Sequence, residues 1–174
     1  MQENTNFMTY EYKEIYVEEN QMSFMLDCYE NFGWRLDENL QSASGASGKA
    51  LHLKRDRKII NKTELTRLQR NFEACVTEIE LLEKRKISTA TVYSMSVGIL
   101  GTVFMALATF AITAQTPHIL LCILLSVPGF LGWILPVFIY KYVLRRQTEK
   151  LAPMIEEKYE EIYTLCEKGN KLLI

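Results

Sequence analysis

Hydrophobic positions run without interruption by charge from Ile87 to Tyr140, a stretch that contains no Asp, Glu, Lys or Arg. A polar break at residues 115–118 divides it into two apolar segments, residues 87–114 and 119–140. Each segment exceeds the roughly 20 helical residues that cross a bilayer core, and a helix satisfies its own backbone in lipid. The pattern predicts two transmembrane helices. The alternative, a hairpin buried in a soluble core, needs more interior than a chain of 174 residues has.

Basic residues flank both predicted spans, whereas the turn between the spans carries none. They are Lys84, Arg85 and Lys86 before the first span, and Lys141, Arg145 and Arg146 after the second. Segments rich in Lys and Arg stay on the cytoplasmic side of a membrane. The sequence therefore predicts a multi-pass protein of the plasma membrane, with both termini in the cytoplasm and the turn outside.

The residues before the spans show the alternating polarity of short strands. The first strand is predicted at Thr9 to Val17, which is rich in aromatic and β-branched residues. Three tyrosines share one face of this strand: Tyr10, Tyr12 and Tyr16. Two further strands are expected around Trp34 to Leu36 and Leu51 to Leu53, because apolar and polar residues alternate there. The Ser/Gly stretch between them is expected to be a loop.

A helix of about three turns is predicted between the first and second strands. Its apolar residues recur at helical spacing, and they are Met22, Met25, Leu26 and Tyr29. Gly33 follows at the place where a glycine commonly ends a helix in the left-handed conformation. Strand, helix, strand and strand together make a small βαββ domain.

The same residues carry a resemblance to a known family. The motifs are Tyr10-Glu11-Tyr12-Lys13, then Gly33-Trp34-Arg35-Leu36, and then Leu53-Lys54-Arg55. In this order they resemble a small βαββ domain family of unknown function, over about residues 9–57. The resemblance implies a fold and no activity, and a shared fold does not determine a function.

Two amphipathic helices are predicted on the cytoplasmic side of the spans. The first has apolar residues at alternating intervals of three and four, namely Leu65, Leu68, Phe72, Cys75, Ile79 and Leu82. The second has a comparable stripe, interrupted by Pro153, at Leu151, Ile155, Tyr159, Ile162 and Cys166. Narrow stripes of this kind favour helix pairing. We expect the two to form an antiparallel coiled-coil stalk; the alternative is that they pair between subunits.

The predicted fold class is therefore α+β and mainly helical. Its parts are a cytoplasmic βαββ domain (1–58), an amphipathic stalk helix (59–86), a first transmembrane helix (87–114), an external turn (115–118), a second transmembrane helix (119–140) and a cytoplasmic C-terminal helix (141–174). Within the first span a row of small residues recurs every fourth position: Ala90, Ser94, Gly98, Thr102 and Ala106. Gly129 and Gly132 offer a similar surface on the second span, so close packing of the two spans is expected.

No enzymatic function is expected, and no catalytic, cofactor-binding or metal-ligating residue is assigned. The sequence contains no P-loop, dinucleotide-binding, zinc-protease or nucleophile-elbow motif. Its two histidines, His52 and His118, are separated by a whole span. The four cysteines fall singly in four segments, so we expect free thiols rather than disulfides or a zinc site.

Charge is unevenly distributed along the polar parts. Residues 1–48 hold nine acidic and two basic residues, whereas residues 49–86 hold eleven basic and six acidic ones. One basic cluster consists of Lys49, Lys54, Arg55, Arg57, Lys58 and Lys62. It could contact lipid headgroups or nucleic acid, but the favoured interpretation is that it compensates the acids of residues 1–48, because no aromatic residues are interleaved with it.

The favoured function is a non-enzymatic, membrane-anchored interaction or scaffold module. The expected partners are the lipid bilayer and a cytoplasmic protein, with a second copy of the chain as an alternative and without nucleic acid. The second hypothesis is a small oligomeric channel or transporter subunit, which the small-residue faces and Pro128 and Pro136 would suit. However, neither span carries an ionisable residue, the usual sign of an ion path. An enzyme of unrecognised type is the third hypothesis; it would need a cleft in the head with converging polar groups.

Overall fold

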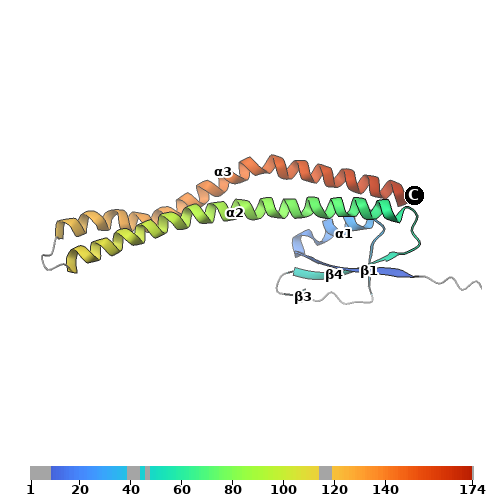
Figure 1. The fold of residues 1–174 in the computed structure, drawn as a ribbon, viewed down its shortest axis with the longest axis horizontal. Helices are drawn as coiled ribbons and strands as arrows, with labels where there is room; N and C mark the ends of the chain where they lie inside the picture. Colours follow the sequence, from blue (N-terminus) through green and yellow to red (C-terminus); the bar gives the residue numbers. More distant parts are fainter. Residues whose placement is uncertain (1–8, 39–43, 46–47, 114–118, 174) are drawn as a thin grey trace, which may run out of the picture. The chain divides into compact units, whose positions relative to one another are not determined.

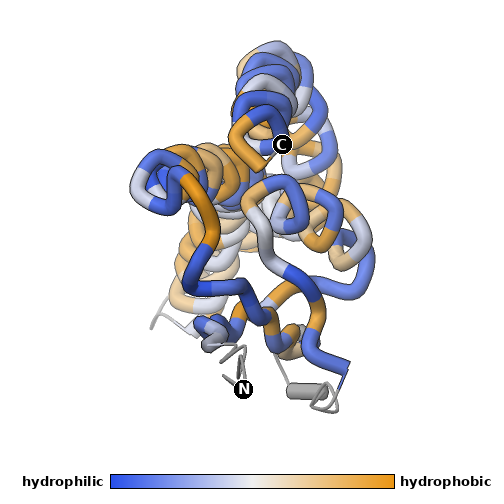
Figure 2. Tube along the Cα trace, turned by 90° about the vertical axis from the view of Figure 1, so that its right-hand side faces the viewer, coloured by the Kyte–Doolittle hydropathy of each residue, from blue (hydrophilic) through white to orange (hydrophobic). Residues whose placement is uncertain are grey.

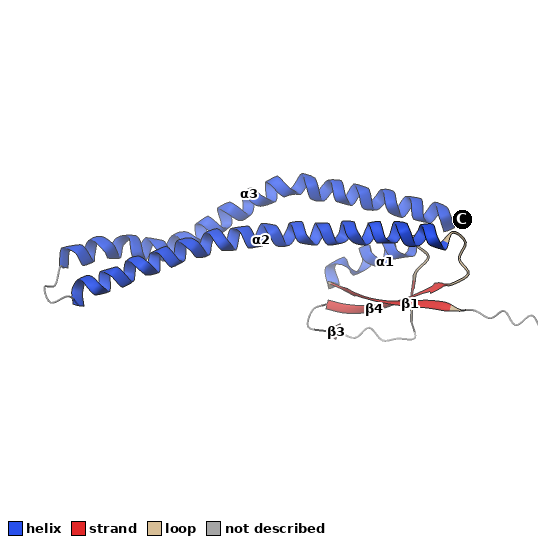
Figure 3. Ribbon diagram, viewed as in Figure 1, coloured by secondary structure: helices blue, strands red, loops and turns tan. Residues whose placement is uncertain are grey.

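The computed structural model describes residues 9–38, 44–45, 48–113 and 119–173. Its elements are β1 (Tyr10–Val17), the short 3-10 helix η1 (Glu19–Gln21), α1 (Met22–Glu30), β2 (Arg35–Leu36), β3 (Ser44–Gly45), β4 (Gly48–Asp56), α2 (Lys62–Thr113) and α3 (Ile119–Leu173) (Figure 1). The chain is mainly helical, with its strands gathered near the N-terminus (Figure 3). The predicted α+β, mainly helical class is confirmed at this level.

Two compact units divide the chain. Met1–Thr77 and Lys158–Ile174 form one unit, called the head below, and Glu78–Glu157 form the other, called the hairpin. Helices α2 and α3 each contribute residues to both units. The end of α3 thus belongs to the same unit as the N-terminal sheet, which was not predicted.

The head contains an antiparallel sheet in the order β1-β4-β2. β1 pairs with β4 over its full length, from Tyr10 opposite Asp56 to Val17 opposite Lys49. The predicted βαββ order is therefore present, and β4 is longer than expected. The segment that was expected to be a loop also contains a two-residue strand, β3, which pairs with the beginning of β4. The rest of that loop, residues 39–43 and 46–47, lies outside the described residues.

Helix α1 ends as its sequence predicts. Gly33 has a φ of +82°, and its amide donates to the carbonyl of Glu30. The amide of Trp34 then reaches back to the carbonyl of Tyr29 at 3.1 Å. A side chain at Gly33 would also meet Ile59 at 2.5 Å, so both conformation and space require glycine here.

The alternation expected after Gly33 is wrong at two residues, Leu36 and Asp37. Trp34 is buried, but Leu36 is 40% exposed and Asp37 is 6% exposed. Asp37 is held inside because it accepts a hydrogen bond from Lys54 at 3.0 Å, and its amide donates to the carbonyl of His52. An ion pair and a backbone bond thus override the polarity pattern of a strand only two residues long.

Side chains from β4, α2, α3 and the turn after α1 form the centre of the core of the head. Its largest fully buried side chains are Phe32, Phe72, Leu51, Leu53, Leu65 and Ile162. The Phe72 ring lies 5.4 Å from that of Tyr29, edge to face, and 5.5 Å from that of Phe32. Along the helices in Figure 2, hydrophobic and hydrophilic residues interchange, as expected for elements that each bury one face.

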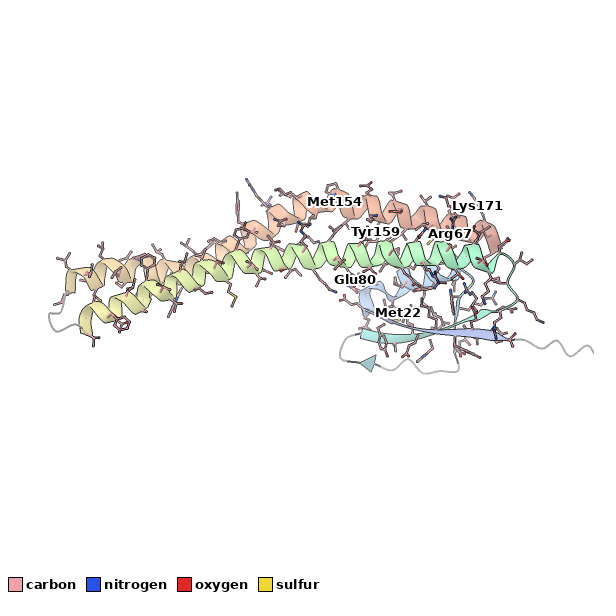
Figure 4. All side chains as sticks on the ribbon, in the orientation of Figure 1. Met22, Arg67, Glu80, Met154, Tyr159 and Lys171 are labelled. Carbon is pink, nitrogen blue, oxygen red and sulfur yellow. The ribbon has the colours of Figure 1, made fainter. Side chains whose placement is uncertain are left out.

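The apolar stripes of both long helices are largely buried as predicted, but their partners differ from the prediction. Phe72 of α2 packs against α1, although α3 was expected to face it. Tyr159 of α3 also packs against α1, with its ring 5.8 Å from that of Phe24 (Figure 4). Within the head, apolar side chains of α2 and α3 therefore contact α1. In a two-helix coiled coil, they would contact only each other. The coiled-coil stalk remains a prediction.

The hairpin brings the two apolar helices into very close contact. A Cβ atom on Gly132 would lie 2.4 Å from the Cα of Gly101, so the backbones touch at this point. The Ser94 hydroxyl donates to the carbonyl of Pro136 at 3.0 Å. The predicted packing of the two apolar helices is confirmed, and α3 continues through all three of its prolines.

The predicted row of small residues is only partly correct. Ala90 is fully buried, whereas Thr102 and Ala106 are exposed. The contact passes instead through Gly101 and on to Ala108, which is 4% exposed. Four residues turn an α-helix by more than one full turn, so a row at every fourth position winds away from a nearly straight partner.

Most apolar side chains of the hairpin point outward. In the most apolar window of each long helix, only 17% of α2 and 11% of α3 is buried. Both helices are long and apolar enough to cross a membrane. A core helix of a soluble protein would bury most of such a window, and these two do not.

A side chain larger than hydrogen at the Gly101 contact should separate the two helices. We expect Gly101→Val to destabilise the hairpin by about 1–3 kcal/mol, because neither backbone can yield without moving its whole helix. Ala106→Val is the matched control, since it adds bulk on the exposed side of the same helix. Denaturant unfolding in detergent micelles, followed by circular dichroism, measures both. Equal stabilities of the two variants would contradict this packing.

Candidate partner-binding face of the head

One face of the sheet carries a row of exposed tyrosines. Tyr10, Tyr12 and Tyr16 project from β1 and are 40%, 67% and 69% exposed. The shared face predicted for them is confirmed, because exposure alternates along β1. We call this side the open face.

Charged groups from all three strands surround these tyrosines. Tyr12 lies opposite Lys54 of β4, and Arg35 of β2 lies opposite Lys54 on its other side. The Lys54 ammonium is 6.0 Å from the centre of the Tyr10 ring. Glu14 accepts a hydrogen bond from the Tyr16 hydroxyl at 3.1 Å. The open face thus combines aromatic rings with cations and an anion.

Two of these contacts shift the pKa values of side chains on the open face. The hydrogen bond to Asp37 raises the pKa of Lys54, so the cation beside Tyr10 is retained across the physiological range. The hydrogen bond to Glu14 raises the pKa of Tyr16, because ionisation would place a second negative charge beside the carboxylate. The phenol therefore remains a donor at neutral pH.

A hollow of about 950 Å³ adjoins the open face. Its lining includes Tyr10, Arg35 and Lys54 from the face. Trp34, which precedes β2, and Leu173, at the end of α3, also line it. It holds acidic and basic side chains as well as apolar ones. Such a lining suits the mixed side chains of a polypeptide better than a ligand with one sign of charge.

The opposite face of the sheet is closed by a polar network under α2. The Arg55 side chain is 4% exposed, donates to Glu11 at 3.0 Å, and lies 4.5 Å from the centre of the Trp34 ring. Lys62, at the beginning of α2, pairs with the same Glu11 carboxylate. Hydrogen bonding from Lys62, and then from Arg55, holds the pKa of Glu11 below its ordinary value against the effect of burial.

A second branch of this network runs along α2. The Trp34 indole donates to Gln69 at 2.8 Å, and the Gln69 amide donates to Glu73 at 2.7 Å. The Tyr29 hydroxyl and the Lys13 ammonium also donate to Glu73. Burial raises the pKa of Glu73, but these three donors together lower it below its ordinary value. The network joins β1, α1 and β2 to the first turns of α2.

The predicted basic cluster is dispersed by the fold. Arg55 and Lys62 pair with Glu11, and Lys54 pairs with Asp37. Both acids belong to residues 1–48, as the favoured interpretation expected. Half of the cluster thus neutralises the domain's own acids, which leaves little basic surface for phosphates.

The sequence pointed to the tyrosines but missed the residues around them. Arg35 of β2 and His52 of β4 reach the open face only through strand pairing, Arg35 opposite Lys54 and His52 opposite Glu14 of β1. Gln69 and Glu73 lie between apolar residues of the α2 stripe, and the i, i+4 spacing of a Gln and a Glu was the only local signal available. Among the residues that the structure describes, no group of three His, Cys, Asp or Glu side chains could hold a metal ion.

Comparison with family models, curated proteins and solved structures found no match to this chain. The resemblance to a βαββ domain family therefore remains a prediction. Its implied order of strands and helix agrees with the head as observed.

Acid should weaken the head through Glu73. The folded protein lowers the pKa of this carboxylate below 4.5, so its contribution is present above that pH and is lost as the pH falls through the folded value. Glu73→Gln should be less stable than the parent at pH 7, and the two should converge as the pH falls below the folded pKa of Glu73. Urea unfolding reports this through Trp34 fluorescence in a Trp133→Phe background. Glu64→Gln, with an exposed carboxylate on the same helix, should leave the profile unchanged; an equal effect there would refute the role of Glu73.

Proposed function

We propose that this protein is a membrane-anchored interaction module whose hairpin lies in the plasma membrane and whose head binds a cytoplasmic protein. The observation that carries the proposal is the open face, where three exposed tyrosines share one side of a sheet. The other side of the same sheet is closed by α1 and α2. Among the elements that the structure describes, these helices lie on that side, and the tyrosines of the open face are exposed to a partner.

Exposed apolar side chains of the hairpin support its place in a membrane. Phe110, Leu120 and Phe138 are 74%, 84% and 66% exposed, and many of their neighbours are similarly exposed. Contiguous apolar surface of this extent is unfavourable in water and favourable in lipid. The basic residues that flank the apolar segments support an orientation with both termini in the cytoplasm.

Residue types on the open face favour a protein as the partner. Tyrosine and arginine are enriched at protein interfaces, where rigid rings provide contact area at low entropic cost. Tyr12 and Tyr16 each expose about two thirds of their surface, so little of it is used in folding. Nucleic acid is a poorer fit, because Glu14 lies on this face and Asp37 already neutralises Lys54.

The channel alternative loses part of its support. Of the small residues that suggested assembly of several hairpins, Gly132 lies against Gly101 of the same chain and Ala90 is fully buried. Ser94, another member of the predicted row, donates its hydroxyl to the second helix of the same hairpin. The interaction module is therefore the function we put forward.

Membrane topology can be tested with single cysteines in a variant whose four native cysteines are serine. With a membrane-impermeant maleimide on intact cells, we expect Thr116→Cys in the turn to be labelled. Lys168→Cys should be labelled only after permeabilisation, because the head lies inside. Labelling of Lys168→Cys in intact cells, or recovery of the protein in the soluble fraction, would contradict the proposal.

Partner binding can be tested by placing the photoreactive residue p-benzoylphenylalanine at position 12 or 16. Irradiation of native membranes should join the same protein to both sites. The matched control is position 60, because Ile60 is 78% exposed on the head but is not on the sheet. Tyr12→Ala should abolish the product formed at position 16 while leaving stability within about 0.5 kcal/mol, as expected for an exposed side chain. If all three positions gave the same crosslinked proteins, or if positions 12 and 16 gave none, the open face would not be the binding surface.

A further inference from the structure

Helices α1 and α3 lie side by side in the head along a matched series of contacts. Near the beginning of α1, Phe24 meets Tyr159 and Tyr163, with ring centres 5.8 and 6.4 Å apart. Near its end, a Cβ atom on Gly169 would lie 2.7 Å from the carbonyl oxygen of Asn31. Residue numbers rise together along both helices, so the two run parallel. A residue midway along the side of α1 that faces α3 therefore lies near a residue midway between these two contacts on α3.

The residues in that middle position are both cysteines. Cys28 lies one turn after Phe24, and Cys166 lies between Tyr163 and Gly169. The ring contacts of Phe24 on one side and the close approach of Gly169 to Asn31 on the other place these two side chains on facing sides of their helices. They are 4% and 7% exposed, and both are free thiols in this structure. The expected free thiols are confirmed. The sequence did not indicate that Cys28 and Cys166 lie near each other, because they belong to distant segments that meet only in the fold.

We propose that Cys28 and Cys166 form a redox site, in which a small peroxide converts the two thiols into a disulfide between α1 and α3. The sulfur of Cys166 attacks one peroxide oxygen, the O–O bond breaks, and a sulfenic acid forms with release of water or an alcohol. The sulfur of Cys28 then attacks the sulfenic sulfur and expels its oxygen as water. Two thiols and one hydrogen peroxide thus give one disulfide and two waters.

Local chemistry assigns the order of the two steps. The hydrogen bond from Cys28 lowers the pKa of Cys166, which favours its thiolate, the form that reacts with peroxides. That same contact, together with burial and the neighbouring Asp27, raises the pKa of Cys28, so Cys28 keeps its proton in the first step. Cys166 is the attacking sulfur and Cys28 the resolving one.

The disulfide would join the last turns of α3 to the N-terminal part of the head. In the reduced state, ring contacts and the close approach at Gly169 hold these two elements together. After oxidation a covalent bond adds to them. Since Leu173 also lines the hollow beside the open face, the site ties a wall of that hollow in place.

Peroxide treatment of the full-length chain in detergent tests the proposal. The protein is reduced, freed of reductant, exposed to hydrogen peroxide, alkylated with N-ethylmaleimide and digested without reduction for mass spectrometry. The expected product is a peptide containing Cys28 joined to one containing Cys166. The number of alkylated thiols should fall from four to two, and amide exchange at residues 159–169 should slow at least tenfold after oxidation.

Matched variants separate this pair from the other thiols. Cys166→Ser should leave Cys28 alkylated and abolish the product, and Cys28→Ser should leave a trapped sulfenic acid on Cys166 that dimedone captures. The double variant Cys75→Ser, Cys122→Ser should form the product as readily as the parent. Oxidation of both Cys28 and Cys166 to sulfinic acids without a cross-link would overturn the proposal. So would four alkylated thiols after treatment, or a disulfide that involves Cys75 or Cys122.

Discussion

The first turns of α2 hold the head together, and the other arrangements of the head depend on them. One side of this helix supplies Phe72 to the rings of α1, and the neighbouring side supplies Gln69 and Glu73 to side chains of the sheet and α1. Burial of a side chain such as Phe72 contributes about 1.5–3 kcal/mol, and the polar contacts select one register from those that apolar packing alone would allow. Lys13 of β1 and Tyr29 of α1 reach Glu73 only in this arrangement, so sliding α2 along the sheet would separate a partly buried carboxylate from two of its donors.

Because helices cover one face of the sheet, the side chains on the other face remain exposed. A three-stranded sheet has two sides, and here helices and ion pairs occupy one of them. The side chains of β1 alternate, so Glu11 and Lys13 turn inward to α2 while Tyr10, Tyr12 and Tyr16 turn outward. Tyrosine tolerates this exposure because its hydroxyl remains hydrated while its ring offers contact area to a partner. The same alternation therefore stabilises the fold and creates the surface that we propose for binding.

The hairpin is held by a different kind of contact. Most apolar side chains of the hairpin point outward, so burial of large side chains contributes little between its two helices, and close packing of the backbones holds them together. Gly101 and Gly132 allow the backbones to touch, and the Ser94 hydroxyl satisfies the carbonyl of Pro136. Two glycines and one hydroxyl thus hold the two helices of the hairpin together, whereas aromatic packing and ion pairs hold the elements of the head together.

The sequence alone was sufficient for features that depend on near neighbours in the chain. Uncharged length predicted the two apolar helices, alternation predicted β1 and its row of tyrosines, and Gly33 predicted the end of α1, because each follows from local backbone geometry and side-chain polarity. Tertiary structure decided which elements meet. Phe72 faces α1 because α1 and α2 cover the same face of the sheet, and Asp37 is buried because Lys54 reaches it from a neighbouring strand. Cys28 and Cys166 meet for the same reason, since a pairing between residues so far apart in the sequence leaves no trace in local pattern.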